Sequence, residues 1–238
     1  MFSNENQDNG ISKSLRRKGL VQRWLFLCLS LAVMAFGVAF SIKANLGTSP
    51  ISSVPYVGSL FTPLTVGEFT ICMHVVFILL QIIILRSRYK PIQLLQLPVA
   101  VLFGYLTDFA LWVLRGVDPP NYGCQWILCV IGIIVVAAGV SMEVTANVVV
   151  LAGEGVQLAV CQVAPIQFSR MKIIFDVSLV CIACVLSLTM VGGLHGVREG
   201  TVAAAILVGG LTRFMLHFEK QHIHFADNPR RPPGKIKS

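Results

Sequence analysis

The stretch SIKANLGTSP, residues 41–50, decides how this chain folds, because it ends an uncharged apolar run at 24–42 with polar, helix-breaking residues. A lysine, an asparagine, a glycine and a Ser-Pro pair follow a helix long enough to enter a membrane. The stretch MEVTANVVVLAGEG, residues 142–155, has the same arrangement after another apolar run. The two stretches therefore predict two long apolar helices, each ending at an Ala-Asn pair and followed by a broken segment.

The composition predicts that the lipid bilayer is the solvent of this chain. Of 238 residues, 55% are hydrophobic and 13% are charged, whereas soluble domains average about 25% charged residues. A spanning helix needs about 20 mostly apolar residues, and six segments meet or nearly meet this length: 24–42, 65–85, 92–114, 125–143, 172–191 and 200–217. We therefore predict an all-α polytopic protein with one transmembrane domain over 24–217 and basic tails at 1–23 and 218–238.

The positive charges predict the orientation. The first span has a basic start like a secretory signal, but its apolar run is longer than the about 7–15 residues of a signal, so we expect a retained helix. With six spans and a cytoplasmic N-terminus, only Lys43, Arg115 and Arg198 of the 19 Lys and Arg residues lie outside, as the positive-inside rule requires. A seventh span over 144–168 would leave 8 inside and 11 outside. We therefore prefer a re-entrant or surface-lying segment there, and both termini in the cytoplasm.

The two breaks belong to an internal repeat of units 24–115 and 125–217. A shift of 102 residues aligns Gly37 with Gly139, Ala44 with Ala146, Asn45 with Asn147, and His74 with Asp176. A shift of 105 residues aligns GYLTDF (104–109) with GGLTRF (209–214). Each unit has three spans, an odd number, so the second unit is inverted relative to the first. Inverted repeats with interrupted helices are a recurring plan of secondary transporters.

The broken segments predict two short helices that face each other. Ser49-Pro50 is a good helix start, because the hydroxyl can cap free N–H groups and proline suits the first turn. This helix would be interrupted again at Pro55. Its counterpart would carry Glu154 in its first turn, where the helix dipole favours an acid. The alternative is that both segments are amphipathic surface loops.

Polar residues within or beside the spans are the candidate site residues. Ionisable groups inside a bilayer usually face a cavity or a partner, although structural hydrogen bonds explain them equally well. Two asparagines end the helices and also face the expected pocket, and the acids Asp108 and Asp176 are candidates for proton coupling. The predicted substrate-binding set is Asn45, Ser49, His74, Asp108, Asn147, Glu154 and Asp176.

Several classes of function find no motif in the chain. It has no Gly-x-x-x-x-Gly-Lys-Ser/Thr, His-Glu-x-x-His or Gly-x-Ser-x-Gly pattern, so we expect neither an ATP-driven pump nor an enzyme, and no cofactor. The Cys-x-x-Cys pair Cys181 and Cys184 has no facing histidine, and we interpret it as packing rather than a metal site. The basic tails lack interleaved aromatic residues and fit anionic lipid better than nucleic acid.

Four stretches carry a resemblance to a known family: KANLGTSPISSVPYV (43–57), LAGEGVQLAV (151–160), KIIFDVSLV (172–180) and GGLHGVREGTVAAAILVG (192–209). They resemble the YczE/YitT-like family of bacterial integral membrane proteins, most closely its YczE side, over most of 24–214. The resemblance implies a multi-pass protein of the bacterial cytoplasmic membrane. It brings no substrate or catalytic residue, and His74 stands where an asparagine is expected in such relatives.

Two functions remain open from the sequence. The first is a secondary-type transporter of a small polar or anionic solute, because opposed helix N-termini favour anionic or carbonyl groups. The second is a non-transporting accessory protein that anchors or regulates a partner complex. The sequence identifies neither a partner protein nor an oligomeric state.

Overall fold

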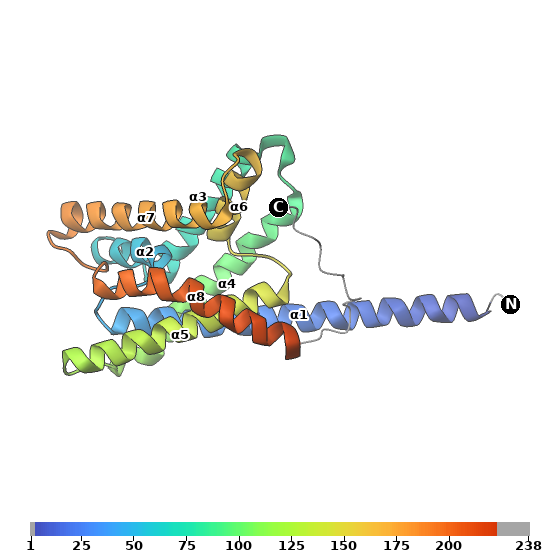
Figure 1. Ribbon diagram of the computed structural model, residues 1–238, viewed down its shortest axis with the longest axis horizontal. Coiled ribbons are helices and arrows are strands. Elements are labelled where there is room, and N and C mark those ends of the chain that lie inside the picture. Colours follow the sequence, from blue (N-terminus) through green and yellow to red (C-terminus); the bar gives the residue numbers. More distant parts are fainter. Residues whose placement is uncertain (1–2, 223–238) are drawn as a thin grey trace.

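The computed structural model describes residues 3–222, with side chains described for 19–218. Within this range all regular structure is helical (Figure 1). Six helices are long: α1 (Ser3–Lys43), α3 (Val66–Leu85), α4 (Gln96–Val113), α5 (Tyr122–Ala146), α7 (Phe168–Leu186) and α8 (Glu199–His222). Two helices, α2 (Pro50–Phe61) and α6 (Ala152–Val163), have 12 residues each. Short 3₁₀ turns lie at Arg86–Arg88, Pro91–Leu95 and Leu114–Gly116, and a π-helical turn at Ser187–Val191 extends α7.

The six predicted spans are confirmed. Within the described part of the chain, six segments are long and apolar enough to cross a membrane: Gly19–Lys43, Val66–Arg88, Pro91–Gly116, Tyr122–Ala146, Phe168–Val191 and Glu199–Phe218. Each overlaps a predicted span and extends it by a few residues. The stretch 144–168 is shared between the end of α5, the short α6 and the start of α7, so it does not form a seventh span.

The two helix breaks use a left-handed asparagine. Asn45 has φ 54° and Asn147 has φ 50°, a conformation that asparagine tolerates better than other side-chain-bearing residues. The prediction about Ser49 is only partly correct: Pro50 is the first residue of α2, but the Ser49 hydroxyl makes no capping bond and instead donates to Ser52 Oγ at 3.0 Å. The predicted interruption at Pro55 is wrong, because α2 continues through this residue.

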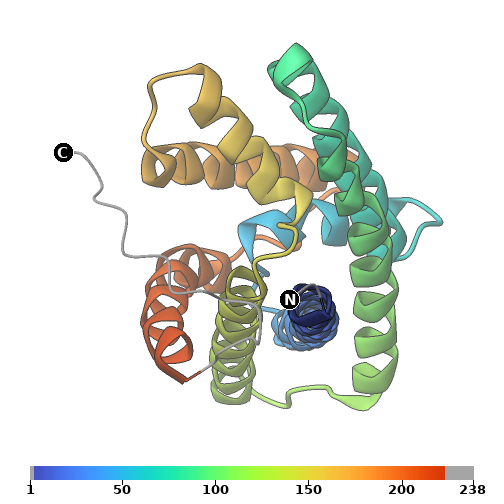
Figure 2. The same cartoon turned by 90° about the vertical axis from the view of Figure 1, so that its right-hand side faces the viewer.

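Helices α1 and α5 form the central antiparallel pair, and glycines allow their backbones to approach closely. A Cβ atom on Gly37 would lie 2.6 Å from the backbone nitrogen of Val136, and one on Gly139 would lie 2.7 Å from Cβ of Met34. Such close contacts at small residues are typical of helix pairs in membranes, where van der Waals packing drives association. Figure 2 shows α1 between α4 and α5, with α8 beyond α5 and with α6 and α7 across the centre.

The remaining contacts cross between the two halves of the chain. The short helix α2 packs on α7, and the short helix α6 packs on α3. In the first half α3 also packs along α4, where Gly67 and Gly104 meet so closely that a Cβ atom on Gly67 would overlap the Gly104 carbonyl. No comparable contact joins α7 and α8 in the described range, and Gly209 and Gly210 of α8 face open space.

Candidate functional site

A cavity of about 110 Å³ lies between the two halves, at the place where both short helices begin. This volume is below the roughly 300–1,000 Å³ of sites for drug-sized ligands, so the cavity suits only a small solute. All six long helices contribute to its wall. Its polar lining residues are Ser49, Ser52, Thr70, His74, Glu143, Glu154, Gln157, Lys172 and Asp176.

The first turns of α2 and α6 meet at this cavity. A Cβ atom on Gly153 would lie 2.4 Å from Cδ1 of Ile51, so the two short helices are in direct contact there. In its middle, α2 packs on the loop before α8, where Tyr56 and Val57 lie against Gly196. The first turn of α2 therefore lines the cavity, while its second turn contacts the loop before α8.

Glu143 occupies the start of α6. Its carboxylate accepts a hydrogen bond of 2.7 Å from the backbone N–H of Leu151, the residue before the helix, and its residue is only 2% exposed. Glu154, in the first turn of α6, is close enough to act on Glu143 electrostatically. Both acids lie where the helix dipole favours negative charge. The positive end of α6 is therefore already matched by carboxylates of the chain itself.

Helix α7 brings a positive charge to the same cavity. Lys172 Nζ lies 3.3 Å from Asp176 Oδ2, one helical turn away, and these two residues act electrostatically on Glu154. From α3, His74 also lines the cavity; it is 1% exposed, with its ring against Phe77 and Phe103. His74 Nδ1 is buried without a hydrogen-bond partner among the described residues.

The structure brings together four of the seven predicted site residues. Ser49, His74, Glu154 and Asp176 line the cavity, and they include His74 and Asp176, which the 102-residue shift aligns. Asn45 and Asn147 are exposed at the helix breaks and do not line it. These two asparagines serve the backbone turns, because their left-handed conformation ends α1 and α5.

Asp108 lies away from the cavity and holds the start of α3. Its carboxylate accepts hydrogen bonds from the Thr65 hydroxyl at 2.5 Å and from the Gly67 backbone N–H at 2.8 Å. Free N–H groups at a helix start favour such an acceptor. Asp108 therefore caps α3 from the neighbouring helix α4, and it leaves the set of candidate binding residues.

Five polar lining residues were absent from the predicted set: Ser52, Thr70, Glu143, Gln157 and Lys172. Glu143 carried a usable signal, because it flanks the Ala-Asn break within a span. Lys172 stands at the start of a span, where interfacial solvation explains a charge. Gln157 is one uncharged polar residue in a weakly apolar stretch, and only the contact between the halves shows which way it faces.

A second, more open cavity of about 280 Å³ adjoins the loop after Asn147. It is lined by Gln93 in the 3₁₀ turn before α4, by Gln96 at the start of α4 and by residues 147–150, and Glu143 lines it as well as the central cavity. We call this side the Arg86 end, since α3 ends there, and the opposite side the Lys43 end, where α1 ends. Glu143 therefore separates the central cavity from the groove at the Arg86 end.

At the Lys43 end, two loops close over the centre, residues 44–48 and 196–201, which we call the loop pair. The Leu46 carbonyl accepts from the Gly200 N–H at 2.8 Å, and the Thr48 N–H donates to the Gly196 carbonyl at 3.2 Å. Gly47, with φ 91°, fits against Thr201 and Arg198 so closely that no Cβ atom could be added. The backbone of the loop pair thus forms a continuous contact between the two halves.

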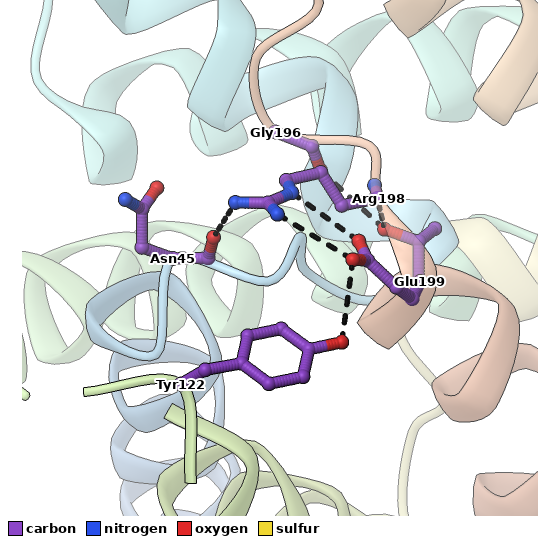
Figure 3. Close-up of polar contacts among 6 residues, drawn as sticks. Asn45, Tyr122, Gly196, Arg198 and Glu199 are labelled. Atoms are coloured by element: carbon purple, nitrogen blue, oxygen red, sulfur yellow. Dashed lines mark hydrogen bonds and ion pairs between the residues drawn. The ribbon is translucent and has the colours of Figure 1, made fainter. Parts of the chain in front are cut away.

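Arg198 joins three segments at this contact (Figure 3). Its guanidinium donates to the Asn45 carbonyl at 3.0 Å and to the Glu199 carboxylate at 3.2 Å, and the Tyr122 hydroxyl at the start of α5 donates to the same carboxylate at 3.5 Å. Arg198 and Glu199 are both partly exposed. The arrangement links the loop after α1, the start of α5 and the start of α8.

Comparisons with known proteins agree with a membrane protein. The chain matches the family of unknown function DUF6198 over residues 21–217. It is 26% identical over 214 residues to the uncharacterized membrane protein YczE of Bacillus subtilis (strain 168). The aligned region covers 88% of this chain and 93% of that protein. No solved structure matches the chain. The resemblance noted in the sequence is thereby confirmed on its YczE side.

Proposed function

The chain belongs to the DUF6198 family, and we propose that it is a secondary-type transporter that carries a small polar solute through the cavity between two inverted repeats. The observation that carries this proposal is the central cavity at the meeting point of α2 and α6. Interrupted helices with substrate sites at the repeat interface are the plan of several transporter folds. The chain has no nucleotide-binding motif of its own, so the energy in this proposal comes from a gradient or from a separate partner protein.

Paired contacts support the inverted repeat. Under the 102-residue shift, the contact of Gly37 with Val136 becomes the contact of Gly139 with Met34, and both occur between α1 and α5. Ile51 contacts Gly153, its own equivalent under this shift, as expected for residues near a twofold axis. The contact of α3 with α6 likewise corresponds to that of α7 with α2.

The two ends of the cavity support alternating access. At the Lys43 end the loop pair closes the centre with backbone hydrogen bonds and the contacts of Arg198. At the Arg86 end Glu143 lines both the cavity and an open groove. The arrangement corresponds to a state closed at the Lys43 end. We further propose that the Arg86 end faces the cytoplasm, because 16 of the 19 Lys and Arg residues then lie inside.

Accessibility of one cavity residue from both sides of the membrane tests this proposal. A variant without the seven native cysteines carries Ser52→Cys, and a membrane-impermeant maleimide is added to right-side-out and to inside-out vesicles. We expect labelling from both sides, and Arg198→Ala should increase the labelling from the Lys43 side. Leu79→Cys, on the lipid-exposed face of α3, is the matched control and should react from neither side.

Labelling of Ser52→Cys from a single side, unchanged by Arg198→Ala, would contradict alternating access. That result would favour the accessory function, in which the membrane domain anchors a partner complex. The same vesicles test the orientation, because a cysteine in place of Ser87, in the turn after α3, should react only from the cytoplasmic side.

A further inference from the structure

The central cavity contains more negative than positive groups. Three carboxylates, Glu143, Glu154 and Asp176, line it together with one lysine, Lys172, which is already paired with Asp176 at 3.3 Å. Glu143 is 2% exposed, so little water is available to solvate its charge. An excess of buried negative charge is costly unless a counter-charge or a proton joins it. The charge of the lining therefore favours a positive ligand.

A buried acceptor without a partner faces the same cavity. Gln157 lines the cavity from α6, its residue is 1% exposed, and its side-chain oxygen Oε1 has no hydrogen-bond partner among the described residues. A buried amide oxygen that stays unpaired costs about 1–3 kcal/mol. Only a hydrogen-bond donor can satisfy this oxygen. Gln157 is thus an observation independent of the acids, and it points to a ligand that carries a hydrogen-bond donor; combined with the positive charge that the acids favour, this donor is an N–H group of a nitrogen cation.

The backbone of α2 adds a further acceptor in the first turn of this helix. Ile51 lines the cavity in the first turn of α2, and Pro55 lies four residues further in the same helix. Proline has no N–H group, so it cannot donate the usual helical hydrogen bond to the Ile51 carbonyl. Conversely, the Leu151 N–H before α6, a donor that an anion could have used, already donates to Glu143.

We propose that the cavity binds a small cation that carries N–H donors, namely ammonium or a small primary amine in its protonated form. This inference rests on the transport function proposed above and names its class of solute, in place of the anion that the helix N-termini favoured at the level of sequence. Glu154 supplies negative charge that the Lys172–Asp176 pair leaves uncompensated, and Gln157 accepts an N–H.

Binding to the purified full-length protein tests the class of ligand. The probes are the chlorides of methylammonium, ammonium and potassium, and sodium acetate as the anion, each measured by thermal shift at matched ionic strength. Potassium resembles ammonium in size and charge but has no N–H group. We expect methylammonium and ammonium to raise the melting temperature in a saturable manner, whereas potassium chloride and sodium acetate should not, because a ligand stabilises the state that binds it.

Two variants assign the effect to the cavity. Gln157→Leu removes the unpaired oxygen and should weaken methylammonium binding at least tenfold, and Glu154→Gln should weaken it by a similar factor. Gln125→Leu, in the first turn of α5 and outside both cavities, should leave the affinity unchanged. If one cavity variant fails to fold, the other still answers the question.

The outcomes separate this inference from the transport proposal. Three results would overturn the proposal that the cavity binds a cation with N–H donors. They are stabilisation by acetate alone, equal stabilisation by potassium and ammonium, and no response to any probe. In each of these cases labelling of Ser52→Cys from both sides would still support transport. Labelling from one side together with saturable methylammonium binding would keep the site and overturn transport.

Discussion

The two loops that follow Asn45 and Asn147 are alike in backbone and different in what holds them. Each follows a long helix, begins at a left-handed asparagine and leads into a 12-residue helix. The first loop is held by the distant segment 196–201, through backbone hydrogen bonds and Arg198. The second loop is held by Glu143, from the last turn of the helix that precedes it.

This difference shows that a repeated local sequence can end in two kinds of closure. The contacts of the loop pair are distributed over several residues from both halves, so the loop pair should stay closed when any one side chain is removed. The loop after Asn147 depends on one buried carboxylate beside an open groove. For a chain that alternates between two states, an unequal closure of this kind biases the resting state toward opening at the Arg86 end.

The largest effect is expected at Gly47. Its φ of 91° disfavours a side chain, and an added Cβ would lie 2.4 Å from Thr201 Oγ1. Gly47→Ala should lower the free energy of unfolding by about 3–4 kcal/mol, from left-handed strain and overpacking together. Equilibrium unfolding in mixed detergent micelles measures this change in the free energy of unfolding. Gly192→Ala is the control, because the φ of Gly192 is 79° but nothing lies within 4 Å of the added Cβ. This variant introduces left-handed strain without overpacking, so its free energy of unfolding should fall by only about 1–2 kcal/mol.

Removing the acceptor of the second loop should have the next largest effect. Glu143→Leu leaves the Leu151 N–H buried without a partner, and it should destabilise the protein by about 1–3 kcal/mol. Glu143→Gln keeps an oxygen acceptor and should lose less. Equal losses for the two variants, measured by thermal unfolding, would show that the hydrogen bond does not hold this loop.

The helices that follow the loops extend the comparison to Asp108. In the first half Asp108 of α4 caps α3, whereas α8 makes no comparable contact with α7 within 3–222. Asp108→Ala should destabilise the protein by about 0.5–2 kcal/mol, as the loss of a helix cap does. Methylammonium binding, measured by thermal shift, should keep its affinity. A tenfold loss of affinity in this variant would instead place Asp108 in the binding site.

The smallest effect is expected at the asparagines themselves. Asn45→Ala and Asn147→Ala should each lower the free energy of unfolding by about 1 kcal/mol, because alanine tolerates the left-handed conformation poorly. Asn45→Gly and Asn147→Gly should lose less, since glycine adopts it freely. If the four variants do not form two matching pairs in thermal unfolding, the two breaks are not equivalent even in their backbones.

Much of the fold could be predicted, because its signals are local. The length and apolar composition of the spans predict six helices, and the Ala-Asn pairs predict where two of them end. The cavity was harder to predict, since four of seven candidate residues line it while Asp108 caps a helix instead. An ionisable residue in a span needs a polar partner, but the sequence does not say whether that partner is a solute or a backbone N–H group.

By itself the sequence determined the six spans, the two broken helices and the offset that relates the halves, since each depends on nearby residues and on the demand of the bilayer for apolar surface. Only the tertiary structure decided that α2 and α6 meet, that Glu143 occupies the start of α6 and that Gln157 faces the cavity. These facts depend on which helix faces lie against each other, and that is decided by the close glycine contacts of α1 with α5 and by the crossed packing of the short helices.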